Sequence, residues 1–302
     1  MPRKAKPGKK FKLKTHKATS KRFRLTGAGV LVLSGANAQT GATTINEGTL
    51  RLSGGLATLS GASQDLTIRQ GAVFDLNGVS TGATIKNLIG SGTITNGVAP
   101  NAPAAATLTV GNGTPAASTF SGVIQDGTGG PLSIVKRGTV AFTFSGLNTY
   151  TGSTTIESTG SITTPTLADI GLPSGIGAGS GTSNATNAAS LVFQGPGTSP
   201  TPALIYTGGA SVSTNRLFTL DMATAGSTAV ITNNSTSGSA LIFSNTSPIV
   251  FGPNATTSQT LTLSGSSSAD SAFFPQVTDN GALPTNLIKA GAGQWILANS
   301  AN

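Results

Sequence analysis

Residues 25–55 read LTGAGVLVLSGANAQTGATTINEGTLRLSGG, and this stretch decides the fold. It holds three short runs of alternating apolar and small polar residues, at 30–33, 43–45 and 49–52. Gly, Ser and Asn, which favour tight turns, separate the runs. Alternation with a period of two, interrupted by turn residues, predicts a strand, turn, strand, turn, strand arrangement.

The same pattern returns later in the chain. A single offset, without gaps, aligns SGAN at 34–37 with SGLN at 145–148, and TTI at 43–45 with TTI at 154–156. A third copy begins at Leu287 and stops at the last residue, inside a repeat. Repeats of this kind predict small units that stack and share one continuous core.

The spacing of large apolar residues indicates how each unit is buried. Five pairs flank a single polar residue: Leu50 and Leu52, Phe74 and Leu76, Leu108 and Val110, Phe142 and Phe144, Leu261 and Leu263. Each strand is therefore expected to bury one side and expose the other, and such short strands have to stack in parallel. We predict an all-β fold, a parallel β-solenoid (β-helix-like) with coils of ~20–25 residues, on the order of ten of them.

Charge divides the chain into two unlike parts. Residues 1–24 hold 11 of the 18 Lys and Arg residues and no acid, whereas the other seven bases face nine acids, a net charge of −2. The formal net charge of +9 therefore comes from the amino-terminal segment. Like charges at this density repel, so residues 1–24 are expected to form a disordered basic arm.

Clustered Lys and Arg residues displace counterions from phosphates, so the arm predicts binding of ribosomal RNA or another polyanion. A solvated tail that only improves solubility is the alternative interpretation. His16 is the single histidine of the chain, and we expect it to contact phosphate or base rather than to act as a catalyst. The candidate contacts are Lys12, Lys14, His16, Lys17, Lys21, Arg22 and Arg24.

The body is expected to comprise solenoid repeats at 25–163, a Gly/Pro/Ser-rich loop region at 164–203 and further repeats at 204–302. A short helix is possible at 167–170 within the loop region, and strands resume near 191–193. The run GIGAGSG at 175–181 is predicted to be a flexible loop, because it lacks the spacing of a phosphate-binding motif.

The sequence offers little for catalysis. There is no Cys, and the single His lies in the arm, so the body lacks the groups of a nucleophilic triad. Six acids exist without a common spacing and are interpreted as solvated turn acids: Asp65, Asp75, Asp126, Glu157, Asp169 and Asp221. Trp295, Phe142 and Phe144 are interpreted as core residues. We therefore predict no enzyme activity, cofactor or metal, and a polysaccharide-active solenoid remains only a third possibility.

The repeat, with its G-x-G-x-L-x-L-S-G-x-N and T-G-x-T-T-I elements, resembles the autotransporter-associated β-strand repeat over about residues 25–302. The resemblance implies a structural passenger that acts in adhesion or display at the cell surface, or is secreted, with an unknown surface ligand. The start of the chain lacks the apolar run of a signal peptide, and no stretch approaches ~18 consecutive apolar residues, so no membrane span is expected.

Residues 13–29, LKTHKATSKRFRLTGAG, resemble the amino terminus of the bacterial large-subunit ribosomal protein numbered thirty-five. This second resemblance implies a cytoplasmic, ribosomal location and binding of ribosomal RNA. Surface and ribosomal locations exclude one another. One hypothesis that reconciles them is a chimeric open reading frame, in which a ribosomal-protein start is joined to a repeat gene at LTGAG.

Overall fold

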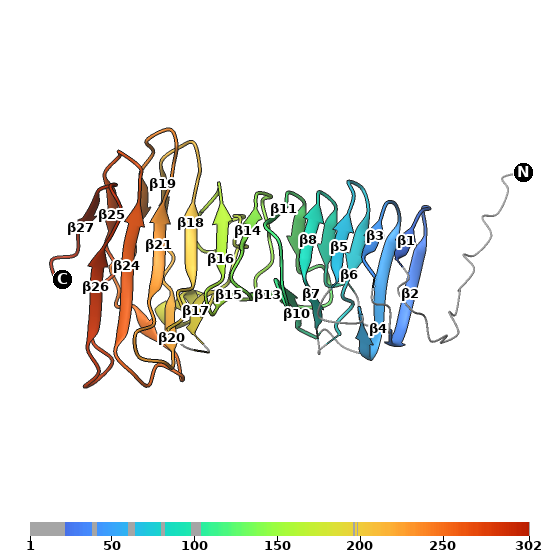
Figure 1. Ribbon diagram of the computed structural model, residues 1–302, viewed down its shortest axis with the longest axis horizontal. Coiled ribbons are helices and arrows are strands. Elements are labelled where there is room, and N and C mark those ends of the chain that lie inside the picture. The colour runs from blue at the N-terminus through green and yellow to red at the C-terminus, as the bar shows by residue number, and fades with distance from the viewer. Residues whose placement is uncertain are drawn as a thin grey trace, which may run out of the picture.

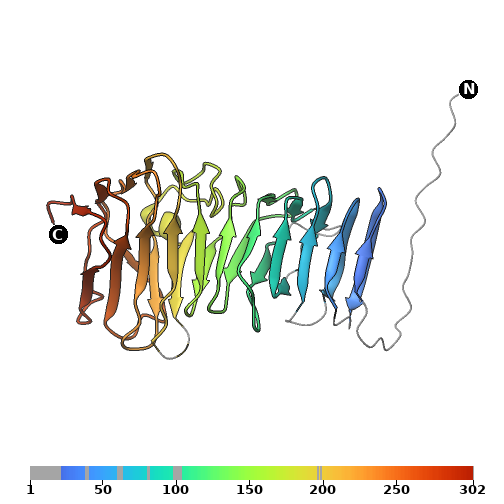
Figure 2. The ribbon, with the colours of Figure 1, turned by 45° about the horizontal axis from the view of Figure 1, so that its top comes forward.

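A computed structural model describes residues 22–37, 41–59, 64–79, 82–97, 104–195, 197 and 199–301. In this part of the chain, 27 short strands and one helix form an elongated stack (Figures 1 and 2). Strands of successive coils lie side by side, and the stack runs from the amino-terminal to the carboxy-terminal side. All pairings between these strands are parallel, which confirms the predicted all-β parallel solenoid.

One sheet of eleven strands runs along the whole stack. Its strands, in order, are β1 (Phe23–Leu25), β3 (Thr43–Ile45), β5 (Asp65–Ile68), β8 (Asn87–Gly90), β11 (Ser118–Phe120), β14 (Ala141–Phe144), β16 (Ser161–Thr164), β18 (Ala203–Tyr206), β21 (Ala229–Asn233), β24 (Gln259–Gly265) and β26 (Thr285–Lys289).

Three shorter sheets form the other faces. The five-stranded sheet contains β2 (Val30–Ala36), β4 (Thr49–Thr58), β6 (Val73–Asp75), β9 (Thr93–Thr95) and β12 (Val123–Gln125). The seven-stranded sheet contains β7 (Ala83–Ile85), β10 (Ala106–Val110), β13 (Leu132–Lys136), β15 (Thr154–Glu157), β17 (Leu191–Gly195), β20 (Thr219–Met222) and β23 (Val250–Phe251). The four-stranded sheet contains β19 (Val212–Thr214), β22 (Leu241–Phe243), β25 (Ser271–Phe273) and β27 (Trp295–Leu297).

The core is a column of inward-facing side chains between these sheets. All ten residues of the five predicted apolar pairs are buried, as the period of two predicted. The expectation that the opposite side is exposed holds less well, because Asp75, Thr109 and Thr262, which lie between three of these pairs, are also buried. Neighbouring segments cover two of them: Thr262 is hydrogen-bonded to Thr228 at 3.0 Å, and the turn after β6 folds over Asp75.

The two sequence copies pair their strands identically but occupy different faces. β1 pairs with β3 in the register Phe23 to Thr43, and β13 pairs with β15 in the register Ile134 to Thr154, which are corresponding positions of the two copies. The first pair belongs to the eleven-stranded sheet, whereas the second belongs to the seven-stranded sheet. The number of faces per coil therefore changes between the copies. The repeated sequence alone does not determine which side of the stack a copy occupies.

Coil length varies more than predicted. Phe23 pairs with Thr43, a coil at the short end of the expected ~20–25 residues. Ser161, by contrast, pairs with Ala203, so that this coil is roughly twice as long. The extra residues belong to an excursion at 165–190 between β16 and β17, the part of the chain in which sequence periodicity is weakest.

This excursion is packed, whereas the sequence predicted a Gly/Pro/Ser-rich loop region at 164–203. Arg216 is only 1% exposed, and its guanidinium donates hydrogen bonds to the carbonyl groups of Ala168, Gly177 and Ala178 at 2.7–2.9 Å. Gly177 lies against the ring of Tyr150, where an added Cβ would stand 2.5 Å from Cε2. The run at 175–181 is therefore held against the core, contrary to the predicted flexible loop.

The helix and two strands also refine the predicted boundaries. Residues 167–170 are not helical; the helix is α1 (Asn184–Ala188), and Ser183 caps it by accepting the amide of Thr186. β17 begins at Leu191, where strands were predicted to resume, and β18 begins at Ala203, the last residue of the region assigned to a loop. At the other end, β1 starts at Phe23, because Phe23 and Leu25 pack against the core, so the solenoid begins two residues earlier than predicted.

Candidate functional site

A groove lined mainly by polar residues runs along the seven-stranded sheet. It forms where the strands end, because parallel stacking aligns Glu157 with Gln194 and Gln194 with Asp221 on successive strands. Arg137 follows β13 directly, and Asn254 follows β23. The groove has a volume of about 320 Å³ and is lined by Arg137, Glu157, Gln194, Gly195, Asp221, Ala223 and Asn254.

Small residues leave room for this groove and for its polar side chains. Gly195 and Ala223 contribute no long side chain to its lining. Gly252 leaves room for the Asp221 side chain, because a Cβ added at residue 252 would stand 2.3 Å from Asp221 Oδ1. Real Cβ atoms do not approach oxygen so closely, so the position of Asp221 depends on the missing side chain of Gly252.

The charged groups of the groove are already hydrogen-bonded. Arg137 Nε donates to Glu157 Oε2 at 2.6 Å, with the arginine side chain 49% exposed and the glutamate side chain 11% exposed. Asp221 accepts hydrogen bonds from the Gln194 side chain and from both the backbone and the side chain of Asn254, at 2.7–2.9 Å. Both carboxylates are therefore held by donors of neighbouring coils or turns. The groove offers hydrogen-bonding atoms on a partly exposed surface.

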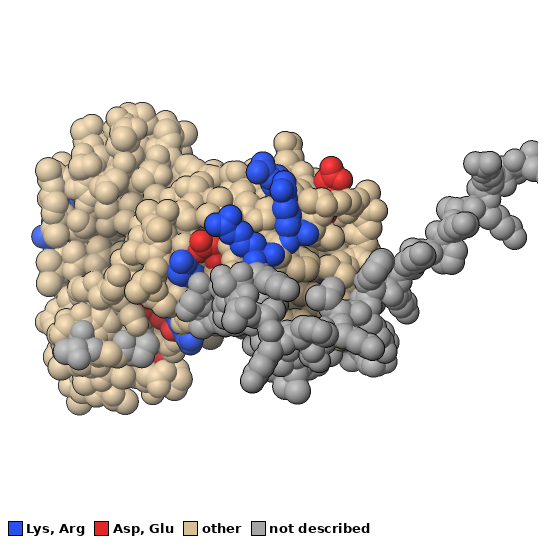
Figure 3. Space-filling model, turned by 45° about the vertical axis from the view of Figure 1, so that its right-hand side comes forward, with Lys and Arg blue, Asp and Glu red and all other residues tan. Residues whose placement is uncertain are grey.

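The predicted polyanion contacts fall into two groups. Lys12, Lys14, His16, Lys17 and Lys21 lie outside the described residues. Arg22 and Arg24 are described and exposed, on either side of Phe23 at the start of the eleven-stranded sheet. Figure 3 shows Lys and Arg side chains gathered towards the amino-terminal half of one face of the molecule.

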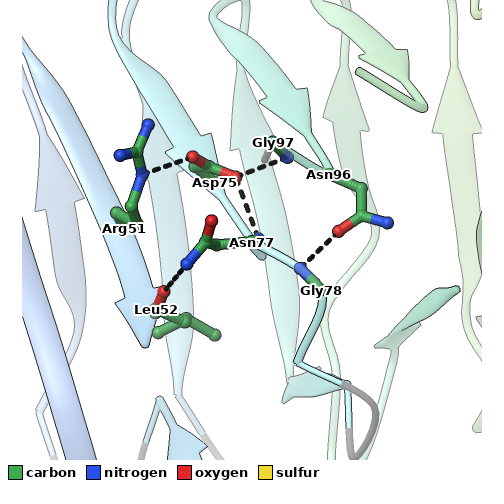
Figure 4. A network of polar contacts seen from close by, with 7 residues as sticks. All are labelled: Arg51, Leu52, Asp75, Asn77, Gly78, Asn96 and Gly97. Carbon is green, nitrogen blue, oxygen red and sulfur yellow. Dashed lines mark hydrogen bonds and ion pairs between the residues drawn. The ribbon is translucent and has the colours of Figure 1, made fainter. Parts of the chain in front are cut away.

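A second polar network lies around Asp75 in the five-stranded sheet (Figure 4). Asp75 Oδ1 accepts the backbone amides of Asn77 at 2.9 Å and Gly97 at 2.7 Å, and Oδ2 accepts Arg51 Nε at 2.7 Å. The Asp75 side chain is 2% exposed. Asn96 extends the network, because its side-chain oxygen accepts the amide of Gly78 at 2.6 Å. These bonds connect neighbouring coils, so the network is structural.

The interpretation of the six acids as solvated turn residues is wrong for four of them: Asp65 is the first residue of β5 and half-buried, and three more are buried. Asp75, Glu157 and Asp221 lie in strands and are buried, because amide and guanidinium donors of neighbouring coils cover them. The other three also hold hydrogen-bond partners: Thr151 and Leu132 for Asp126, the amide of Asn215 for Asp169, and Asn87 with Lys86 for Asp65.

Two cations lie inside the fold. Burial lowers the pKa of Lys136 to about 8, and the Nζ atom lies 5.8 Å from the centre of the Phe142 ring and donates to the carbonyl groups of Arg137 and Gly138. Burial also lowers the pKa of Arg216 to about 10, an effect that Tyr150 and Asp169 oppose. Both residues hold turns of the backbone, and neither faces the groove opening.

Aromatic residues line the core rather than a ligand site. Phe142 and Phe144 are buried, with ring centres 5.9 Å apart, as predicted. Trp295 is half-buried, and its indole N–H donates to the carbonyl of Ser264 at 2.9 Å. It borders a smaller apolar hollow of about 230 Å³ with Leu263, Leu287, Ile288, Lys289 and Leu297.

The described residues contain no group of three or more His, Cys, Asp and Glu side chains arranged to hold a metal ion. Within the same ranges, no helix has the length and apolar character needed to cross a membrane. Sequence patterns did not indicate Gln194, Asn254 or the groove itself. Only the register between coils brings these residues together, and the intervals between them in the chain are irregular.

Comparison with protein families identifies the passenger-associated-transport-repeat at residues 23–52 and 134–162. The starts of the two matches, at 23 and 134, are separated by the same offset as the copies at 34 and 145, which confirms the predicted repeat, and the first match includes β1. The third copy near Leu287 and the ribosomal resemblance of residues 13–29 stay predictions.

Among curated proteins, the chain is similar to the adhesin BmaC autotransporter of Brucella suis biovar 1 (strain 1330), with 35% identity over 270 residues. The similarity covers 89% of this chain and 7% of that relative, so the chain spans a small part of the relative's length. No solved structure matches the chain. The chain therefore carries passenger-type repeats and is similar to an autotransporter adhesin.

Proposed function

We propose that this chain is part of a non-enzymatic passenger of the autotransporter type, exposed on a cell surface or released from it, which acts in adhesion. The observation that carries the proposal is that the similarity to an adhesin extends over 89% of the chain, well beyond the two matched repeat copies. A stack of parallel coils along one axis suits this role, because it holds a contact surface at a distance from its anchor.

Within this proposal, the polar groove is the surface that contacts the ligand. The half-exposed Arg137 guanidinium retains N–H groups beyond those bound to Glu157, and Gln194 and Asn254 add side-chain amides. These groups suit a ligand that presents hydroxyl or amide groups. Hydrolysis of a polysaccharide is disfavoured, because Glu157 and Asp221 are both held by neighbouring donors.

The experiment is adhesion of beads coated with the full-length protein to cultured animal cells, with albumin-coated beads as the reference. We expect severalfold more bound beads than with albumin, and a loss of at least threefold for Arg137→Gln combined with Gln194→Ala. Lys289→Gln, an exposed change on β26, is the matched control and should bind like the parent. Equal binding by parent and albumin beads would reject the adhesive role, while full binding by the groove variant would reject only the groove.

The basic arm carries a separate proposal, binding of a polyanion through Lys12, Lys14, His16, Lys17, Lys21, Arg22 and Arg24. The exposure of Arg22 and Arg24 favours it. The full chain should bind single-stranded RNA with an affinity that falls as salt rises. A plot of log binding constant against log salt concentration should have a slope of about −0.7 for each phosphate contacted. Affinity that does not change with salt would contradict an electrostatic arm.

A further inference from the structure

The outer face of the eleven-stranded sheet carries a second charged feature, at its amino-terminal end. Phe23 and Leu25 pack against the core, so the alternating residues Arg22 and Arg24 project outwards and are exposed. Arg69 follows β5 directly after the buried Ile68 and is also exposed. Its Nε donates to the Asn46 side chain at 3.0 Å, which orients the guanidinium.

Strand register places these three arginines close together. Arg24 pairs with Thr44, and Thr44 pairs with Thr67, two residues before Arg69. With strands ~4.8 Å apart and residues ~3.3 Å apart along a strand, the backbone of Arg69 lies roughly 12 Å from that of Arg24 and roughly 16 Å from that of Arg22. We call Arg22, Arg24 and Arg69 the arginine patch.

Within the described residues, no carboxylate neutralises the arginine patch. Most other described cations are paired or buried: Arg51, Lys86 and Arg137 form ion pairs with Asp75, Asp65 and Glu157, and Lys136 and Arg216 lie inside the fold. Lys289 is exposed but stands at the far end of the sheet. The acids nearest the patch are Asp65, which Lys86 holds, and Glu47, which is exposed in the turn between β3 and β4. The local balance of charge is therefore positive.

A row of threonines continues along the same face. Thr44 pairs with Thr67, Thr119 pairs with Thr143, and Thr143 pairs with Thr163. Ile89, 39% exposed, occupies the position between Thr67 and Thr119. These five threonines are at least partly exposed, and within the described residues their hydroxyl groups form no hydrogen bond. The threonine row therefore offers donors and acceptors at intervals of ~4.8 Å, or twice that across Ile89.

We propose that the arginine patch and the threonine row together bind an anionic polysaccharide lying along the solenoid axis. Guanidinium groups match sulfate and carboxylate groups with paired hydrogen bonds, and threonine hydroxyls match sugar hydroxyls. Single-stranded RNA fits less well, because recognition of its bases relies on exposed aromatic side chains. None of the patch and row residues is aromatic. The site lies on the solenoid and does not require the arm.

The test uses the full-length chain in which the nine Lys and Arg residues of 1–21 are replaced by Ser. Immobilised heparin, a sulfated polysaccharide, is the probe, and affinity is measured from low to high salt. We expect this arm-neutral chain to bind heparin with salt-dependent affinity. Arg22→Gln, Arg24→Gln and Arg69→Gln, combined in that chain, should weaken binding at least tenfold and flatten the log–log salt slope by about 2–3, close to one unit per charge removed.

Two further variants separate charge from hydroxyl contacts. Lys289→Gln, the matched charge control on the last coil of the eleven-stranded sheet, should change the affinity by less than twofold. Thr67→Val with Thr143→Val keeps the shape of both side chains and should weaken binding about threefold without changing the salt slope. Circular dichroism of every variant checks that the β-structure is retained.

Two results would overturn the proposal. One is heparin binding that the three arginine substitutions leave unchanged in a folded arm-neutral chain. The other is tighter binding of single-stranded RNA than of heparin by that chain, which would identify a nucleic-acid surface instead. Both readouts are independent of cell adhesion, so they do not depend on the proposed function of the groove.

Discussion

Asp75 accepts the backbone amide of Gly97 at 2.7 Å, although the two residues are 22 positions apart in the sequence. The same oxygen holds the amide of Asn77, so one buried carboxylate secures the turns of two coils. Asp75→Ala should lower the free energy of unfolding by about 3–5 kcal/mol, because it leaves buried donors without an acceptor. Asp75→Asn, which keeps one side-chain oxygen, should cost about half as much. Urea unfolding measures both.

The control for this prediction is Glu47→Ala, an exposed acid in a nearby turn, which should change the stability by no more than about 0.5 kcal/mol. Most of the loss in Asp75→Ala should come from the amides, because the Arg51 side chain is 40% exposed and exposed ion pairs contribute little. A cost equal to that of Glu47→Ala would mean that the network does not hold the coils.

Gly252 leaves space for the Asp221 side chain, so Gly252→Ala should destabilise the fold by about 1–3 kcal/mol through overpacking. Combining it with Asp221→Ala should remove only part of that penalty, because the contacts with Oδ1 and Cγ disappear while Cβ of residue 221, 2.7 Å from the added Cβ, remains. A double-mutant cycle measures the coupling. Gly29→Ala, where an added Cβ has no neighbour within 4 Å, is the matched glycine control. Additive effects of the two substitutions would refute the proposed contact.

Arg216→Met should loosen the excursion at 165–190, because the carbonyl groups of Ala168, Gly177 and Ala178 lose their donor. The substitution removes these hydrogen bonds, which destabilises the fold, but it also removes the cost of burying a charge. The free energy of unfolding should therefore change only slightly, on the order of 1–2 kcal/mol. The local effect should be larger. Amide hydrogen exchange within 165–190 should accelerate at least tenfold, with the amides of β24 unchanged as the internal reference.

The lowered pKa of Lys136 should make the stability of the fold depend on pH. Its pKa is about 8 in the fold against 10.5 in the unfolded chain, so between these values the unfolded chain binds the extra proton and stability rises with pH. The melting temperature should therefore increase from pH 7.5 to 9.5. At higher pH the raised pKa of Tyr150 acts in the opposite direction, because the unfolded tyrosine ionises first.

Lys136→Met should flatten that rise, and Lys289→Met should leave it intact. Lys289 makes a fair control because it also donates to the carbonyl groups of the two residues that follow it, but in an exposed coil. A parent melting temperature that falls steadily across this range would show that Lys136 is not the controlling group.

Local alternation was sufficient to predict the strands and the buried apolar pairs, because both depend on residues two positions apart, and the repeated motif predicted their stacking into a solenoid. Burial of Asp75 could not be predicted in that way, since its cover comes from Gly97 in the next coil. The packing of the excursion depends on a bond from Arg216 to Ala168 across 48 residues. The groove was missed for the same reason: Gln194 acquires its neighbours only through pairing between coils of unequal length.

The two sequence copies with identical internal register stand on different sides of the stack. The length of the coils between the copies therefore decides which side of the stack the later copy faces. An insertion or deletion that adds or removes one strand upstream would turn every later copy towards a different side, without changing a residue within it. Such a protein can redirect the surface that meets its surroundings through changes in segment length alone, while the residues that build the surface stay the same.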